Sequence, residues 1–305
     1  MKFFNNLFDI KDEQVILGLN DELKAIYLYD YYLNKTKSIL VVCNTLFEAN
    51  NLYKSLSNYT DNVLFFPMDD FLTSEALAIS PEFEITRLET INNLITNNKQ
   101  IVVTNLMGLL RYLPTKENYE KSIIDLKVNM DYDIKKLESD LYSIGYHSES
   151  FVNKTGEYAP RGFVLDIFPL GNIDPIRIEF WGDTIDSIKT FDVDTQLTKS
   201  SVDSIKILPI TEFITNKDVS SDDRRQKKLI KYESVSNISG YLDNCTLTYI
   251  NYDEIEIGYK NLLDDIFNYN TENNLDVNTK YMHNLEEIKS NNILFISSFD
   301  NNPDN

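Results

Sequence analysis

The clearest indication of the fold is the segment Ser38–Cys43, with the sequence SILVVC, a nearly continuous apolar run. Two further runs have the same character, Asn62–Phe66 (NVLFF) and Gln100–Thr104 (QIVVT). Runs of this kind are typical of strands that are buried on both faces of a sheet. Apolar residues at helical spacing separate the runs: Leu46, Ala49, Leu52, Tyr53 and Leu56, then Ile85, Leu88, Ile91, Leu94 and Ile95. The pattern predicts a parallel sheet flanked by helices, as in a Rossmann-like or RecA-like fold.

The segment from residue 142 to residue 195 has a different pattern, in which apolar and polar residues alternate. Ile176, Ile178 and Phe180 alternate with Arg177 and Glu179, which is the period of a strand with one buried face. The turn sequences in this segment are Thr155-Gly156, Leu170-Gly171-Asn172 and Gly182-Asp183. The segment is therefore predicted to form a small antiparallel meander of hairpins.

Apolar strand patterns return late in the chain, at Thr246–Ile250 (TLTYI) and Asn292–Ile296 (NILFI). These two segments are expected to complete the first sheet, which makes the antiparallel region an insertion. The predicted fold class is α/β, with a RecA-like (P-loop NTPase-like) parallel sheet interrupted by a small antiparallel β-rich domain. The predicted domains are residues 1–125, 126–205 and 206–305.

The chain is strongly acidic. Its 305 residues include 48 Asp and Glu against 29 Lys and Arg, a formal net charge of -19. Such a protein repels the phosphates of DNA, so nonspecific nucleic-acid binding would require a local basic patch. The run Asp222–Lys228 (DDRRQKK) is not such a patch, because its charges nearly cancel. It is interpreted as a solvated helix face.

The cysteines and the apolar runs indicate the compartment. Cys43 and Cys245 lie far apart in the sequence, and no C-x-x-C pair is present. This predicts buried, reduced thiols, no zinc site and a cytoplasmic location. No run approaches the ~18 uninterrupted apolar residues that a membrane span needs, so no membrane partner is expected.

Residues 17–25 (LGLNDELKA) lie where a P-loop of the form G-x-x-x-x-G-K-[ST] would connect a strand to a helix. Only Gly18 and Lys24 fit this motif. Leu23 and Ala25 replace the second glycine and the hydroxyl residue, which a phosphate-binding loop needs for close backbone approach and for magnesium. The loop is therefore a degenerate P-loop.

The carboxylates of Asp21 and Glu22 further oppose a triphosphate at this loop, because like charges repel. The sequence predicts that this chain binds no nucleotide and no other cofactor, and that Lys24 is a surface residue of the helix. An ATPase fragment that still holds nucleotide through Lys24 is the alternative from the enzyme class.

The most specific motif of the chain lies in the predicted β-rich domain. It consists of Gly156–Pro169 (GEYAPRGFVLDIFP), Pro175–Ile188 (PIRIEFWGDTIDSI) and Phe191–Gln196 (FDVDTQ). These segments closely resemble bacterial transcription-repair coupling factors and, more distantly, the excision-repair helicase subunit UvrB. The resemblance extends to Ser80–Leu88 (SPEFEITRL) and to the degenerate P-loop, so it covers nearly the whole chain. That loop is an intact Walker motif in UvrB and has decayed in coupling factors, as here.

The resemblance implies a UvrB-like module whose β-rich domain docks onto the damage sensor UvrA. By the family's pattern, the UvrA-facing surface uses arginines and an acidic residue on adjacent strands, which match Arg161, Arg177 and Glu179. Ser148 stands where relatives commonly carry arginine, and Ala159 stands where UvrB has one. Both differences remove hydrogen-bond donors, so weaker or differently balanced UvrA binding is expected.

The function that this resemblance implies is recruitment of UvrA by a non-catalytic N-terminal module. The longer proteins of the family displace stalled RNA polymerase with an ATP- and magnesium-dependent DNA translocase and start nucleotide excision repair. Contacts with RNA polymerase, DNA, ATP and magnesium are therefore assigned to regions outside this chain. A purely structural domain is the remaining alternative, which the differences at Ser148 and Ala159 would favour.

Three further residues are expected to have no direct role. Trp181, the only tryptophan, is interpreted as a packing residue near a turn, His147 as an exposed bystander, and His283 as structural or solvated. Two distant histidines do not suffice for a catalytic triad or a histidine-rich metal site.

Overall fold

The computed structural model describes residues 15–69, 81–96, 99–214 and 235–298. The chain divides into two compact units, of which unit 1 comprises Met1–Leu113 and Val235–Asn305, and unit 2 comprises Pro114–Ser234. Unit 2 is thus inserted into unit 1. The run Asp222–Lys228 lies outside the described residues, and the finer division at residues 125 and 205 stays a prediction.

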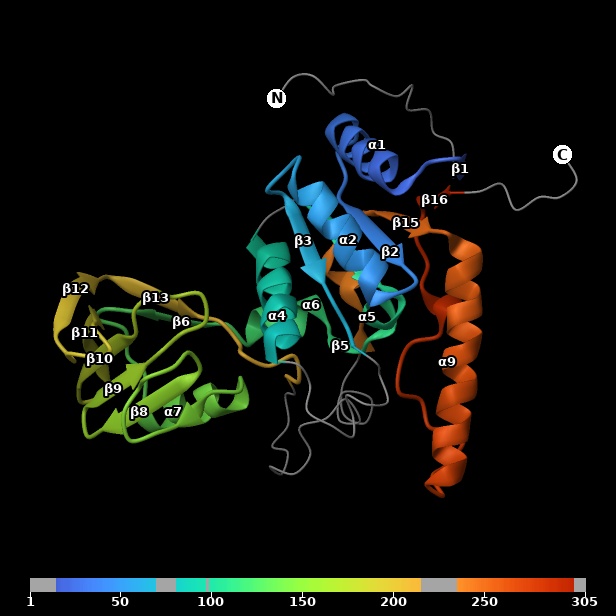
Figure 1. Ribbon diagram of the computed structural model, residues 1–305. Coiled ribbons are helices and arrows are strands. Elements are labelled where there is room, and N and C mark those ends of the chain that lie inside the picture. Colours follow the sequence, from blue (N-terminus) through green and yellow to red (C-terminus); the bar gives the residue numbers. More distant parts are fainter. Residues whose placement is uncertain (1–14, 70–80, 97–98, 215–234, 299–305) are drawn as a thin grey trace, which may run out of the picture. The chain divides into compact units, whose positions relative to one another are not determined.

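Unit 1 is built on a six-stranded sheet with the order β1-β16-β15-β2-β4-β3 (Figure 1). All neighbouring strands in it are parallel. The strands are β1 (Val15–Leu17), β2 (Ile39–Cys43), β3 (Val63–Phe66), β4 (Ile101–Asn105), β15 (Thr246–Ile250) and β16 (Ile293–Ser297). The parallel sheet predicted from the apolar runs is confirmed, and β15 and β16 complete it as expected.

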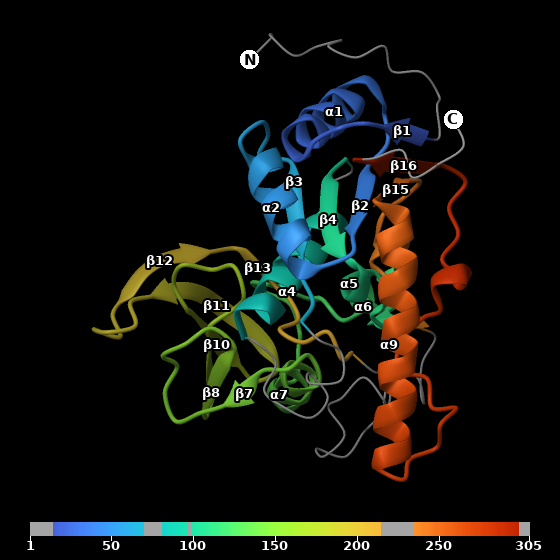
Figure 2. The same cartoon turned by 45° about the vertical axis from the view of Figure 1, so that its right-hand side comes forward.

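The helices of unit 1 are α1 (Asp21–Asn34), α2 (Leu46–Ser57), α4 (Pro81–Thr96), α5 (Leu106–Leu110) and α9 (Tyr252–Glu272), with the short 3-10 helices η1 (Ile238–Tyr241) and η2 (Leu285–Glu287). Thr45 and Glu48 form a capping box that fixes the start of α2. The side chains of Leu28, Val41 and Leu56 join α1, β2 and α2 in one buried cluster. Figure 2 shows the long helix α9 starting beside the end of β15. Within the described residues, no helix has the length and hydropathy to cross a membrane.

The insertion leaves and re-enters unit 1 at neighbouring positions. Strand β5 (Leu113–Pro114) and strand β14 (Val235–Ser236) form a two-stranded sheet with each other. The chain therefore passes into unit 2 and returns at a single place.

Unit 2 contains a second six-stranded sheet with the order β12-β11-β10-β9-β8-β7. Its strands are β7 (His147–Ser148), β8 (Glu157–Arg161), β9 (Val164–Ile167), β10 (Ile176–Trp181), β11 (Thr184–Phe191) and β12 (Thr198–Val202). Strands β8 to β12 are antiparallel neighbours, as predicted, whereas β7 runs parallel to β8. At the predicted turn between β10 and β11, Gly182 has a φ of 63°, which a residue without a Cβ adopts easily.

One face of this second sheet is buried. Ile176 and Ile178 pack there with Leu137 and Leu141 of helix α7 (Ile134–Ser143). The remaining elements of unit 2 are α6 (Lys116–Lys121) and the paired strands β6 (Ile124–Lys127) and β13 (Ser204–Ile207). The opposite face of the sheet is called the outward face below. It carries Ala159, Arg161, Asp166, Arg177, Glu179, Ser187 and Lys189.

Candidate functional site

The outward face contains all three residues that the resemblance singles out. In β10, Ile176 and Ile178 are fully buried while Arg177 and Glu179 are half-buried on the other side. The alternation predicted for this strand is confirmed. Arg161 lies at the end of β8, and strand β9 separates it from β10. The three side chains are therefore not on adjacent strands. Strand β9, between them, contributes another charged side chain to the outward face.

That group is the carboxylate of Asp166, which is 0% exposed. Arg177 lies opposite Asp166 in the strand register. Its Nε donates to Oδ1 at 2.7 Å and its Nη2 donates to Oδ2 at 2.9 Å. Arg161 Nη2 also donates to Oδ2 of Asp166. One buried carboxylate thus holds two guanidinium groups, which is the pairing that such a charge needs away from water.

Arg177 is held on three sides. Its guanidinium lies 4.6 Å from the centre of the Phe191 ring, and its Nη2 also approaches Gln196 Oε1 at 3.4 Å. The hydrogen bonds to Asp166 raise the pKa of Arg177 above its usual value. Its side chain is 19% exposed, so a partner can reach part of this well-anchored side chain.

Arg161 is the more open of the two arginines. Its side chain is 40% exposed, and its guanidinium lies 5.3 Å from the centre of the Phe151 ring. Gly162 follows directly, at the tip of the hairpin between β8 and β9. Arg161 is therefore bonded to Asp166 through one nitrogen while part of its side chain stays exposed to solvent.

Glu179 is part of a cross-strand ion pair. Its Oε2 accepts from Lys189 Nζ at 2.6 Å and from Ser187 Oγ at 2.8 Å. These bonds, with Lys189 first, lower the pKa of Glu179. The Glu179 side chain is 35% exposed, so a partner can still reach it.

Two large aromatic side chains stand beside these charges. Trp181 is 84% exposed and Phe163 is 68% exposed, so the interpretation of Trp181 as a packing residue is wrong. Phe180 N donates to Phe163 O at 2.8 Å, which brings the two hairpin tips to the same end of the sheet. The exposure of Trp181 could have been predicted from the sequence. Residues 177, 179 and 181 alternate along β10, so Trp181 lies on the same outward side as Arg177 and Glu179.

Ala159 and Ser148, the two positions at which the resemblance implies a departure from relatives, have opposite surroundings. Ala159 is 1% exposed and belongs to a small apolar cluster with Val152 and Phe191. Ser148, in the edge strand β7, is exposed. An arginine at residue 148 would extend into solvent, whereas at residue 159 it would have to displace the cluster.

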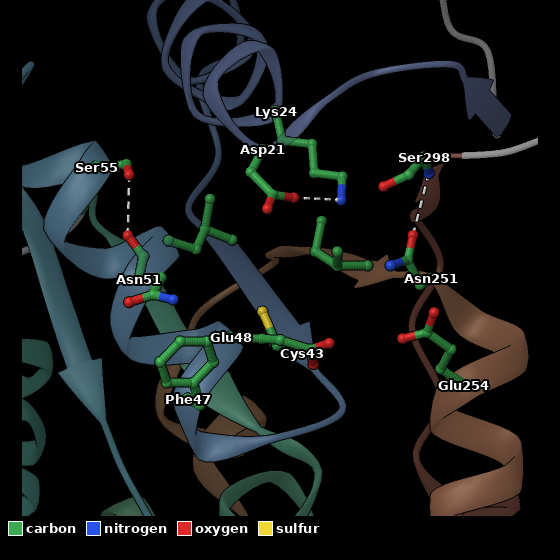
Figure 3. A pocket seen from close by; sticks show the side chains of 12 residues that line it. Asp21, Lys24, Cys43, Phe47, Glu48, Asn51, Ser55, Asn251, Glu254 and Ser298 are labelled. Carbon is green, nitrogen blue, oxygen red and sulfur yellow. Dashed lines mark hydrogen bonds and ion pairs between the residues drawn. The ribbon is translucent and has the colours of Figure 1, made fainter.

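Residues 17–25, predicted from the sequence to be a degenerate P-loop, lie beside a cavity of about 270 Å³ in unit 1, shown in Figure 3. Its lining includes Lys24 from α1, Cys43 from the end of β2 and Asn251 after β15. β2 and β15 are neighbours in the sheet, but the strands that follow them in sequence lie toward opposite edges: β3 follows β2, and β16 follows β15. Ligands of open α/β sheets bind at such a point.

Lys24 is buried, so the prediction of a surface residue is wrong. Its side chain is 4% exposed, and its Nζ lies 2.9 Å from Asp21 Oδ1. Glu48 and Glu254 also line the cavity. Lys24 is thus paired within its own helix, and the lining has more carboxylates than ammonium groups.

The two histidines and the two cysteines have the surroundings predicted for them. His147 is exposed, and His283 has a structural contact, with Nε2 2.9 Å from Ser236 O. Cys43 and Cys245 are buried free thiols, and burial raises the pKa of both. In the part of the chain that the structure describes, no group of three or more His, Cys, Asp or Glu residues is arranged to hold a metal ion.

The chain matches a known domain family over most of unit 2. Residues 124–213 match the model described as the UvrB interaction domain. The match covers the whole outward face and the helix α7 behind it. The chain therefore carries a UvrB interaction domain.

Relatives along a longer part of the chain define it further. It is 32% identical over 222 residues to the transcription-repair-coupling factor of Staphylococcus haemolyticus (strain JCSC1435), covering 72% of this chain and 19% of that protein. The corresponding protein of Staphylococcus aureus (strain USA300) is 31% identical over 216 residues, 70% of this chain and 18% of that protein. The chain is a relative of the transcription-repair-coupling factors, which are DNA-repair proteins, and it spans less than a fifth of their length.

Proposed function

We propose that this chain is a non-catalytic recruitment module that binds UvrA through the outward face of unit 2. The observation that carries the proposal is the group of Arg161, Arg177 and Trp181 on one exposed face of a UvrB interaction domain. The identity of the partner rests on the resemblance to coupling factors and UvrB.

The chemistry of the face suits a protein partner. Arginine and tryptophan are the residue types that most often dominate protein interfaces. Arg161 retains N–H groups that no side chain or backbone group of the described residues engages, and a guanidinium can bind a partner carboxylate through two parallel hydrogen bonds. Trp181 and Phe163 offer apolar area beside these charges. Such a surface supports binding of a partner that presents a carboxylate next to an apolar pocket.

The same face has lost part of the pattern of its relatives. Ala159 cannot donate a hydrogen bond, and the segment around Val152 covers it. Contact with a partner is therefore expected at the ends of β8 and β10, where Arg161 and Trp181 lie, rather than at the middle of β8. This shift is a reason to expect a different balance of contacts rather than a loss of docking.

We further propose that unit 1 is a RecA-like frame that holds no nucleotide. Lys24 is paired with Asp21, and Glu48 and Glu254 add negative charge to the cavity, so the triphosphate would meet repulsion where a P-loop offers attraction. We assign DNA translocation, and the displacement of RNA polymerase that depends on it, to parts of the longer relatives outside the matched region. A cytoplasmic location follows from this role in DNA repair.

The proposal is tested by titrating the cognate UvrA with the wild-type chain and with Arg161→Glu, using calorimetry. We expect the wild type to bind and the variant to bind at least about 30-fold more weakly, since disrupting an interfacial charge pair typically costs ~2–5 kcal/mol. Lys127→Glu is the matched control, because Lys127 is exposed on β6 and the charge change is the same. Equal affinity of wild type and Arg161→Glu would remove Arg161 from the interface, and no binding by the folded wild type would refute the recruitment role.

A further inference from the structure

The buried carboxylate of Asp166 lies below the docking surface, where no partner can touch it. It is 0% exposed, and it sits in the middle strand of three, between the strands that carry Arg161 and Arg177. It accepts three hydrogen bonds from these two guanidinium groups. We infer that Asp166 is a positioning residue of the docking face, which sets the orientation of both arginines before the partner arrives. The inference rests on the proposed function of that face.

The geometry determines which part of each guanidinium is left for a partner. Arg177 uses its Nε and Nη2 on Asp166, so its Nη1 is the nitrogen left for other contacts. Among the residues that the structure describes, Arg161 has a hydrogen bond through Nη2 alone, so its Nε and Nη1 can serve a partner. A fixed fork of this kind matches a carboxylate in one orientation, which a freely rotating arginine does not.

An aromatic ring against each arginine adds to the positioning. The guanidinium carbon of Arg177 lies 4.6 Å from the centre of the buried Phe191 ring, and that of Arg161 lies 5.3 Å from the centre of the exposed Phe151 ring. Each guanidinium is therefore in contact with both a ring and the Asp166 carboxylate. Because the side chains are already ordered, binding does not have to reduce their conformational entropy, which would otherwise weaken the affinity.

Asp166 also limits the net charge of the face. Around Asp166, Arg161, Arg177 and Lys189 are positive while Asp166 and Glu179 are negative. Glu157, at the start of β8 on the same side, is a further carboxylate, and it accepts hydrogen bonds from the amides of Asn153 and Lys154. Since Lys189 is paired with Glu179, the two arginines share one negative charge. The exposed part of the group is thus positive on a chain whose net charge is -19, which fits an acidic site on the partner.

The experiment compares UvrA affinity for the wild type, Asp166→Asn and a control, Asp174→Asn. Asp174 is a carboxylate of the same unit that pairs with Lys199, so the control removes one charge without touching the arginines. We expect Asp166→Asn to weaken binding about 5- to 100-fold, the loss expected when two long side chains must be ordered on binding, and Asp174→Asn to bind like the wild type.

A combined variant separates positioning from a general structural effect. If Asp166 acts through the arginines, then adding Asp166→Asn to the Arg161→Ala, Arg177→Ala double variant changes the residual affinity less than about twofold, because the groups that it positions are gone. An undiminished effect in that background would overturn the inference. Wild-type affinity of a folded Asp166→Asn variant would overturn it as well, and would leave the recruitment role intact.

A second measurement keeps the inference testable if Asp166→Asn does not fold or if UvrA does not bind. The chain has six arginines, so the Nε–H signals of the wild type can be resolved by nuclear magnetic resonance. The Nε–H of Arg177, which donates to Asp166, is expected to exchange with water at least about tenfold more slowly than that of Arg161, because a hydrogen-bonded proton must be released before it exchanges. Equal and fast exchange of both would refute the positioning role without reference to any partner.

Discussion

The ammonium group of Lys24 lies 2.9 Å from the carboxylate of Asp21, one helical turn earlier, and the lysine is buried while the aspartate is 96% exposed. The lysine of the predicted degenerate P-loop is therefore already paired with an exposed carboxylate. A nucleotide at this position would have to displace Asp21 and would then meet Glu48 and Glu254.

We predict that ATP with magnesium gives no saturable heat when titrated into this chain. The reason is electrostatic, because the carboxylates around Lys24 repel a triphosphate. The measurement is isothermal titration calorimetry with wild type and Lys24→Ala. A saturable heat in the wild type that Lys24→Ala abolishes would contradict the prediction and would favour the ATPase alternative.

Replacing Trp181 with alanine should weaken UvrA binding about 30-fold or more, because exposed aromatic anchors at the centre of an interface contribute ~2 kcal/mol or more. The free energy of unfolding should change by no more than ~0.5 kcal/mol, since the side chain is 84% exposed. Phe47→Ala in unit 1, another exposed aromatic residue, is the control and should leave binding unchanged. If Trp181→Ala binds UvrA as tightly as the wild type, the partner does not cover this end of the sheet.

Restoring the arginine of UvrB at residue 159 should destabilise the chain. Ala159 is 1% exposed beside Val152 and Phe191, so Ala159→Arg must push this cluster apart, at a cost of ~1–3 kcal/mol. Chemical denaturation measures the effect. Ser148→Arg, at an exposed position, is the matched control and should be as stable as the wild type. Unchanged stability of Ala159→Arg would mean that the segment around Val152 moves aside at no cost.

Asp192 should stabilise the turn between β11 and β12 in a pH-dependent way. The amide of Thr195 donates to its carboxylate at 3.0 Å, and Lys199 lies 3.0 Å from the same group. These interactions, with the Thr195 amide first, lower the pKa of Asp192 from 3.8 to about 2. Because the folded pKa is the lower one, the stabilisation is complete above pH 3.8 and is lost as the pH falls through about 2.

The difference in melting temperature between wild type and Asp192→Asn should accordingly shrink as the pH is lowered across that range. Scanning calorimetry at several pH values measures it. A difference that stays constant from pH 3.8 to about 2 would show that the carboxylate does not stabilise the turn.

The layout of unit 1 could be predicted because its strands are buried on both faces. Segments such as Ser38–Cys43 have no polar side to present, so a central position in a parallel sheet was the consistent interpretation. Period two in Ile176–Phe180 likewise revealed a sheet with one covered face. The parallel pairing of β7 with β8 was not predictable, since two residues carry no periodicity.

The candidate site was predicted less completely, because its details depend on residues distant in sequence. Asp166 alternates in the sequence with the apolar residues Leu165 and Ile167, but its burial comes with its hydrogen bonds to Arg161 and Arg177, which lie on two other strands. The burial of Lys24 depends in the same way on α2 and the end of β15, which line the same cavity. Trp181 was misjudged on residue type, since a lone tryptophan is most often packed, although its place in the alternation indicated the opposite.

Because β5 pairs with β14, the two ends of the inserted unit 2 lie next to each other. The chain leaves unit 1 at Leu113 and re-enters it at Val235, and these residues belong to paired strands. A short linker between them can therefore replace unit 2 without moving either strand. The outward face can then be lost, exchanged or transferred to another protein while the connections of the parallel sheet stay the same. The sequences of the two units are therefore free to diverge at different rates.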